Sequence, residues 1–169
     1  VLDITDECPT GDLDWFSNPL TDFDSDGCQD QLEDLDDDND LVLDSVDFCL
    51  DGELNWESNL ATDHDADGCQ DLTEDIDDDN DGVEDLYENC PLGELDWISD
   101  PVLDYDGDGC RDATEDLDDD NDGVTDLDDS CQKGDLDWQS YNVTDSDADG
   151  CQDLTEDLDY ETPEAEESG

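Results

Sequence analysis

The sequence predicts a small, disulfide-rich and irregular fold: a linear repeat with little regular secondary structure and no large hydrophobic core. Three observations support this prediction. The chain has 169 residues, of which 62 are Asp or Glu and only 2 are Lys or Arg, while hydrophobic residues make up 32%. It contains 8 cysteines. These cysteines recur at a fixed spacing along the chain, and other residues follow the same period.

The net charge of -60 by itself suggests a disordered polyanion, because low hydrophobicity and high charge cannot offset the entropy lost on folding. The charge excludes nucleic acids and anionic membrane surfaces as partners, since both are bound through Lys and Arg. No apolar run approaches the roughly 20 residues of a membrane span. The regular cysteine spacing argues against simple disorder.

Consecutive cysteines are separated alternately by 20 and 21 residues, so the repeat is 41 residues long. Trp15, Trp56, Trp97 and Trp138 follow the same period. Such a period is typical of an array in which each unit contacts its neighbours. The predicted segments are residues 1–8, the end of a preceding loop; repeats 9–49, 50–90, 91–131 and 132–159, the last truncated; and an acidic tail, 160–169.

An even number of regularly spaced cysteines without C-x-x-C pairs indicates a disulfide framework. Zinc is the alternative, but cysteines this far apart, with His64 as the one histidine, do not form a zinc site. We favour the pairs Cys8–Cys28, Cys49–Cys69, Cys90–Cys110 and Cys131–Cys151. A staggered scheme would leave Cys8 and Cys151 to pair between chains. Disulfides imply an oxidising compartment, so we expect a secreted or cell-surface protein, processed to begin at Val1.

The acidic residues form two types of loop. First-type loops satisfy D-x-D-x-D-G-x5-E, in which acids at positions 1, 3 and 5 converge on one centre and Gly at position 6 permits a sharp turn. Position 7, here a cysteine, offers its carbonyl, position 9 an acid that can act through water, and position 12 a bidentate Glu. The predicted ligands are Asp22, Asp24, Asp26, Cys28, Asp30 and Glu33; Asp63, Asp65, Asp67, Cys69, Asp71 and Glu74; Asp104, Asp106, Asp108, Cys110, Asp112 and Glu115; and Asp145, Asp147, Asp149, Cys151, Asp153 and Glu156.

Second-type loops begin three residues after the Glu of the first three first-type loops and fit the same template. In the first of them Leu41 replaces the glycine, so that loop is expected to be strained, because leucine at positive φ is unfavourable. The predicted ligands are Asp36, Asp38, Asp40, Asp44 and Asp47; Asp77, Asp79, Asp81, Asp85 and Glu88; and Asp118, Asp120, Asp122, Asp126 and Asp129.

Seven loops in register favour calcium over a solvated, disordered acidic tract, and predict about seven or more calcium ions per chain. Magnesium suits such cages less well, because it keeps its waters and usually binds through one or two carboxylates. Without metal, neighbouring carboxylates repel each other, so folding and ion binding are expected to be one event. The predicted fold is therefore a calcium-stabilised repeat rod.

The strings DDDNDGVEDLYENCP, residues 77–91, and DDDNDGVTDLDDSC, residues 118–131, resemble thrombospondin type 3 repeats. The resemblance covers the acidic loops and cysteines of all four units. It implies an extracellular rod in which irregular backbone wraps a line of calcium ions and is pinned by disulfides. Residues 9–21 and their copies, which carry an L-D/N-W motif, depart from that family. EF-hands match less well, since their flanking amphipathic helices are missing.

The few apolar residues allow two interpretations. Leu13 and Trp15 are two residues apart, so they share a face of an extended segment, as do their copies. We favour a miniature core in which the Trp covers its disulfide and Leu32, Leu35, Leu72 or Ile76; a contact between chains is the alternative. Short helical turns are expected over residues 28–35 and their copies. His64, at loop position 2, is expected to be exposed.

The two ends of the chain match parts of one further loop. Asp3 and Asp6 align with positions 9 and 12 of a second-type loop, and Asp159 with position 1. Either the chain was cut from a longer array, or subunits associate head to tail, completing a shared calcium site and forming a filament.

We therefore expect an extracellular calcium-binding structural protein: a rod, a stalk or the subunit of a filament. The alternatives are a soluble calcium buffer or mineral-binding acidic protein, and a calcium-dependent adhesion module. Catalysis is not expected, because the chain has a single histidine and too little apolar material for a dry pocket.

Overall fold

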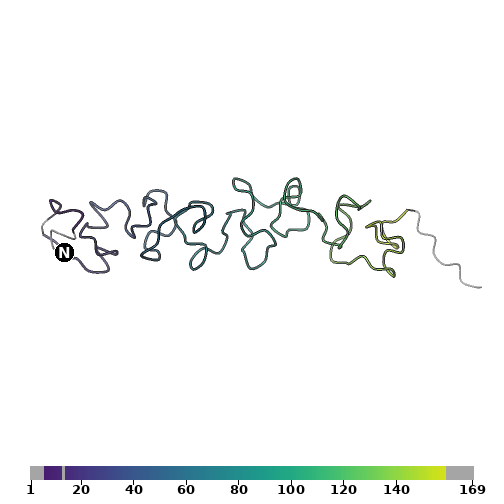
Figure 1. Cartoon of the computed structure of the whole chain (residues 1–169), viewed down its shortest axis with the longest axis horizontal. Coiled ribbons are helices and arrows are strands. Elements are labelled where there is room, and N and C mark those ends of the chain that lie inside the picture. The colour runs from purple at the N-terminus through teal and green to yellow at the C-terminus, as the bar shows by residue number, and fades with distance from the viewer. Residues whose placement is uncertain (1–5, 13, 159–169) are drawn as a thin grey trace, which may run out of the picture. The chain divides into compact units, whose positions relative to one another are not determined.

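The structure is a computed structural model, and it describes residues 6–12 and 14–158. Within this part the backbone consists of turns, bends and irregular segments, with no helix and no strand. Figure 1 accordingly shows a plain trace without helical ribbons or arrows. The described part also contains no helix with the length and apolar composition needed to cross a membrane. The expectation of an irregular, disulfide-rich fold is confirmed.

All eight cysteines are paired in the scheme that we favoured from the sequence. Cys8–Cys28, Cys49–Cys69, Cys90–Cys110 and Cys131–Cys151 each join residues 20 positions apart. Each bridge therefore closes one short loop, which in the chain-entropy model stabilises the folded state by roughly 3 kcal/mol.

The chain forms two compact units, each of which contains two disulfides. The first unit is Val1–Asn80 with Glu84–Leu86, and the second is Asp81–Val83 with Tyr87–Gly169. The chain passes from one unit to the other within the second-type loop at residues 77–88.

A single tight turn follows the second cysteine of every disulfide. The carbonyl of Gln29 accepts hydrogen bonds from the backbone N–H groups of Leu32, Glu33 and Asp34 at 3.0–3.2 Å. The carbonyls of Gln70, Arg111 and Gln152 accept the corresponding bonds in the other repeats. The expected short helical turns over residues 28–35 and their copies are present as one turn each, and none continues into a helix.

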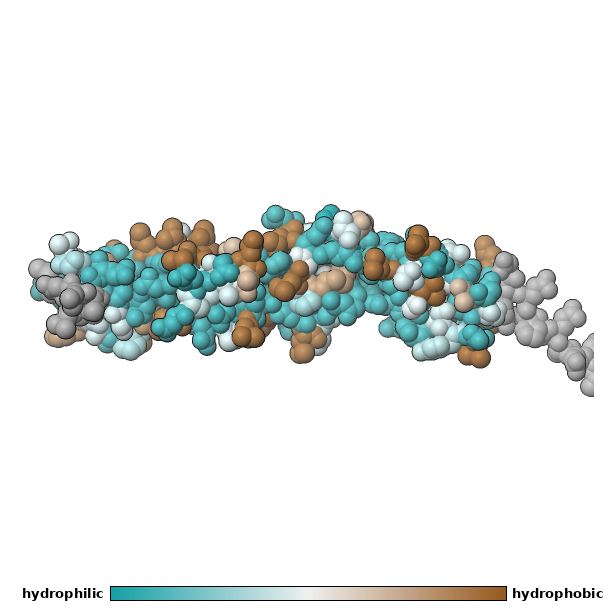
Figure 2. Space-filling model, in the orientation of Figure 1, coloured by the Kyte–Doolittle hydropathy of each residue, from teal (hydrophilic) through white to brown (hydrophobic). Residues whose placement is uncertain are grey.

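The expected miniature apolar core is wrong. Leu32, Leu35, Leu72 and Ile76 are 64–89% exposed, and Figure 2 shows apolar side chains dispersed over a largely hydrophilic surface. In the first repeat the turn directs Glu33 and Asp34 inward, so the neighbouring leucines face solvent. Trp97 is buried, and the other three tryptophans are half-buried. Leu13 lies outside the described residues.

Candidate metal centre

Aspartates fill the interior of the described part. The largest fully buried side chains are all aspartates. They occupy position 1 of every first-type loop and positions 3 and 5 of every second-type loop: Asp22, Asp63, Asp104 and Asp145, then Asp38, Asp40, Asp79, Asp81, Asp120 and Asp122. The buried apolar residues, by contrast, are Trp97 and the position-7 cysteines Cys28, Cys69, Cys110 and Cys151. Burying so many ionised carboxylates is costly unless a cation compensates them.

The backbone of every loop takes the left-handed conformation twice. At position 6 the glycines have φ between 81° and 100°, and Leu41, which replaces glycine in one loop, has φ 81°. The strain expected at Leu41 is thus confirmed. Position 4 is also left-handed in all seven loops, with φ between 55° and 77°, although it holds Ser, Ala, Asn or Gly. The template did not reveal this second feature.

Backbone N–H groups hold the carboxylates of each loop in place. The N–H of position 7 donates to Oδ1 of the position-5 aspartate, for example from Cys28 to Asp26 at 2.7 Å and from Val124 to Asp122 at 2.7 Å. These bonds leave the other carboxylate oxygen for a different partner. Oδ2 of Asp22, Asp40 and Asp122 is buried and accepts no hydrogen bond. A buried carboxylate oxygen without a hydrogen-bond partner is a group that could coordinate a cation.

The oxygens of these acids gather closely enough to share an ion. One carboxylate oxygen from each of Asp22, Asp24 and Asp26 lies within 4.8 Å of the others. The same holds for the triads Asp36, Asp38, Asp40 and Asp63, Asp65, Asp67. These clusters can hold metal ions, and their donors are oxygens, which hard cations such as calcium prefer.

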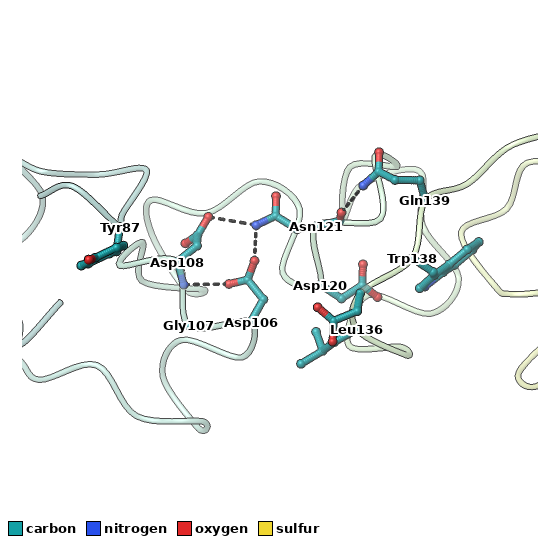
Figure 3. Close-up of a pocket in the computed structure, with 10 residues that line it drawn as sticks. Tyr87, Asp106, Gly107, Asp108, Asp120, Asn121, Leu136, Trp138 and Gln139 are labelled. Carbon is teal, nitrogen blue, oxygen red and sulfur yellow. Dashed lines mark hydrogen bonds between the residues drawn. The ribbon is translucent and has the colours of Figure 1, made fainter. Parts of the chain in front are cut away.

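An asparagine links the two loop types within a repeat. Asn121, at position 4 of a second-type loop, donates from its side-chain amide to Asp106 and to Oδ2 of Asp108, the latter at 3.1 Å. Figure 3 shows this amide between the two carboxylates, with Gln139 donating to the Asn121 carbonyl. Asn39 and Asn80 donate likewise to Asp24 and Asp65. All three second-type loops carry Asn at position 4, and this recurrence is the sequence feature from which the link could have been predicted.

The aspartate at position 9 accepts a hydrogen bond from the backbone N–H of position 2 in each loop. In first-type loops Oδ1 of Asp30 accepts from the N–H of Phe23 at 3.2 Å, and Asp112 accepts from Tyr105 at 2.9 Å. In second-type loops Asp44 accepts from Asp37 at 2.9 Å. One oxygen of the predicted position-9 ligand is therefore engaged with the backbone of its own loop.

The position-12 acids contact residues outside their own loops. Oε2 of Glu33 accepts from the N–H of Asp12 at 2.9 Å, beside Gly11, while Oε1 is buried without a hydrogen-bond partner. Asp47 closes a second-type loop, and its Oδ1 lies only 2.2 Å from where a Cβ on Gly68 would sit. Asp129 approaches Gly150, and Glu88 approaches Gly109, in the same way.

The end of one repeat is joined to the first-type loop of the next by backbone as well. Phe48 donates its N–H to the carbonyl of Asp67 at 2.8 Å, and Ser130 donates to Asp149 at 2.7 Å. The position-12 acid of a second-type loop is thus placed beside the loop that follows it, which would allow the acid to serve both.

Burial is common to nearly all of the predicted ligands. Among the described residues every predicted ligand is buried or half-buried except Asp147, which is exposed. Asp24, Asp65 and Asp106, its counterparts, receive an asparagine from the following second-type loop, whereas the aligned residue after Asp147 is Thr162. Asp6 is half-buried and accepts from the N–H of Cys8 at 3.0 Å. Asp3 and Asp159 lie outside the described residues.

Two further observations depart from the sequence predictions. His64 is half-buried rather than exposed, and its backbone N–H donates to Oδ1 of Asp71 at 2.9 Å in the first unit. Acids outside both templates are also buried or half-buried: Asp34, Asp37, Asp75, Asp78, Asp116, Asp119 and Asp157. The template did not predict these residues.

Burial and mutual repulsion raise the pKa values of many of these acids. Removal from water, followed by the charge of Asp40, raises the pKa of Asp38 to about 7. Burial and the charge of Asp108 raise the pKa of Asp106 to about 7. Burial is also the main cause that raises the pKa of Asp122 to about 6. A cation would favour the ionised forms and so compete with protons.

No protein-family model matches the chain, and no curated protein matches it either. The geometry of the acidic loops therefore carries the functional inference.

Proposed function

We propose that this chain is an extracellular structural repeat protein in which calcium ions take the place of a hydrophobic core. The observation that carries the proposal is the set of fully buried aspartates at fixed loop positions, several of which have an oxygen without a hydrogen-bond partner. A folded interior of this kind needs counter-charges, and the chain supplies only 2 Lys or Arg against 62 acids.

Calcium is the cation that the donor set favours. The donors clustered in the acidic triads are carboxylate oxygens, and calcium takes 6–8 oxygen ligands in flexible geometry. Extracellular calcium modules typically bind at ~10⁻⁴–10⁻³ M, so these loops would be filled outside cells. The four disulfides are consistent with an oxidising, extracellular setting.

The resemblance of the second-type loops to thrombospondin type 3 repeats supports a rod or stalk. The direct backbone links between consecutive repeats support it too, since they tie each loop to the next within a unit.

A calcium titration followed by small-angle scattering and native mass spectrometry tests the proposal. We expect an expanded chain in EDTA that becomes compact and protease-resistant as it takes up calcium, with about one ion or more per loop. Magnesium at the same concentration is the control and should compact the chain less. A chain that stays compact in excess EDTA, with its disulfides intact, would overturn the proposal. Calcium uptake without a change in size would indicate a buffer instead.

A further inference from the structure

A third group of acids lies between the two loops of each of the first three repeats, and it combines the position-9 aspartate of the first-type loop with two acids that are not template ligands. In the first repeat it consists of Asp30, Asp34 and Asp37, and one carboxylate oxygen from each lies within 4.8 Å of the others. We call this group the junction cluster. Its copies are Asp71, Asp75 and Asp78 in the second repeat, and Asp112, Asp116 and Asp119 in the third.

The junction clusters hold buried oxygens without hydrogen-bond partners. Asp34 accepts from the N–H groups of Leu35 and Asp36 through Oδ1, whereas its Oδ2 is buried and accepts no hydrogen bond. Asp78 is 8% exposed, and its Oδ1 is buried and unsatisfied; Oδ2 of Asp75 is unsatisfied as well. Backbone N–H groups therefore hold Asp34 in place, but one buried oxygen of each of these acids still lacks a hydrogen-bond partner.

A cationic side chain from the fourth repeat contacts the junction cluster of the third. The ammonium group of Lys133 contacts Oδ2 of Asp112, and its Nζ lies 3.6 Å from Oδ2 of Asp119. The same Nζ lies 5.8 Å from the centre of the Tyr105 ring. Lys133 is the only lysine of the chain, and both acids that it contacts, Asp112 and Asp119, belong to the junction cluster.

The other repeats have no such side chain. The residue aligned with Lys133 is Leu92 one period earlier, which corresponds to the junction cluster of the second repeat, and Asp51 two periods earlier, which corresponds to that of the first. Asp51 lies close enough to repel both Asp30 and Asp37. The first junction cluster thus has an additional negative charge where the third has a tethered positive one.

We infer that the junction cluster is a further cation site: it binds a calcium ion in the first and second repeats, and the Lys133 ammonium occupies it in the third. The inference rests on the proposed function only in taking calcium as the cation. It adds ions beyond one per loop, and it assigns Lys133 the role of a built-in counter-ion. A divalent ion and an ammonium group satisfy the same demand, because both place positive charge among buried carboxylates.

Counting bound calcium on variants of the whole oxidised chain tests this inference, with native mass spectrometry as the readout. Lys133→Gln should bind one calcium ion more than the wild type, because it vacates the third cluster. Asp78→Asn should bind one fewer. Arg111→Gln is the matched control: it also removes one positive charge, and Gln is the aligned residue in the other three repeats. Its count should equal that of the wild type.

A terbium luminescence measurement locates the additional ion. Because Tyr105 lies beside the Lys133 ammonium, terbium bound by Lys133→Gln should show emission sensitised by this ring. That increment should disappear when Tyr105→Phe is added. An unchanged calcium count in Lys133→Gln, or in Asp78→Asn, would overturn the inference. A wild-type chain that binds no calcium would instead overturn the proposed function.

Discussion

At the scale of single residues, glycine is required for two separable reasons. Gly68 and Gly107 both have positive φ, 91° and 77°. A Cβ on Gly68 would lie 2.2 Å from Oδ1 of Asp47, whereas a Cβ on Gly107 would meet nothing within 4 Å. The residues aligned with Gly107 in the second and fourth repeats are Ala66 and Ala148, both left-handed. Gly68 therefore needs the absence of a side chain, whereas position 4 needs only tolerance of the backbone conformation.

This difference predicts unequal costs for two identical substitutions. Gly107→Ala should lower the free energy of unfolding by about 1 kcal/mol or less, from backbone strain alone. Gly68→Ala should cost at least about 2 kcal/mol, because the new methyl group also displaces Asp47. Urea unfolding in saturating calcium measures both, and Gly107→Ala serves as the control. If both substitutions lowered the free energy of unfolding equally, the contact of the Asp47 carboxylate with Gly68 would not contribute to stability.

At the scale of the loop, the asparagine at position 4 has two roles. Its left-handed φ, 55° in Asn121, is one that asparagine accepts more readily than most residues. Its amide also donates to acids of the preceding first-type loop. The two loops of a repeat are therefore coupled through a side chain that is not itself a predicted ligand.

Substitution by glycine separates these roles. Asn121→Gly keeps the backbone conformation accessible and removes the donor to Asp106 and Asp108. We expect a loss of about 2 kcal/mol in stability, the usual value for a hydrogen bond to a charged group, and a less cooperative calcium titration. Asn55→Gly is the control, since Asn55 is exposed, has φ 69° and lies outside both loop types. If Asn55→Gly lost as much stability as Asn121→Gly, the Asn121 amide would not couple the two loops.

The loop scale also shows how far the sequence alone could predict the molecule. The template located the fully buried aspartates and predicted the strain at Leu41, and the disulfide scheme that we favoured over the staggered alternative is the one present. It did not predict the junction clusters, since Asp34 lies between the two loops and Asp37 is at position 2 of the second-type loop, neither of which is a ligand position of the template. The prediction of a miniature core was wrong because it assumed that leucine side chains are buried in preference to aspartates. In this chain the aspartates are buried and the leucines are exposed.

For the whole molecule, the consequence is a fold whose stability depends on solution conditions more than on packing. The net charge is -60, and the described interior adds unsatisfied carboxylates to that repulsion. Disulfides shorten the unfolded chain without supplying any counter-charge. Protons and cations are then the two agents that can stabilise the buried acids, and they compete for the same oxygens.

This competition predicts opposite pH dependences with and without calcium. Burial and neighbouring carboxylates raise the pKa of Asp38 and Asp106 to about 7, and those of Asp65 and Asp122 to about 6, from an ordinary value of 3.8. Because these pKa values are higher in the folded chain, its stability without calcium is fully present below about pH 4 and is lost as the pH rises through 7. In calcium the sign reverses, since ion binding needs the ionised carboxylates.

Scattering in EDTA should therefore give a smaller radius of gyration at pH 5 than at pH 8. Calorimetry near pH 6.5, repeated in buffers of different ionisation enthalpy, should detect protons released as calcium binds, and calcium affinity should rise between pH 5 and pH 8. The chain with Asp38→Asn and Asp106→Asn should release fewer protons, because two of the groups that titrate in this range are gone. Calcium binding without any proton release would mean that these carboxylates are already ionised before the ion arrives. Repulsion among buried charges would then be balanced in some other way.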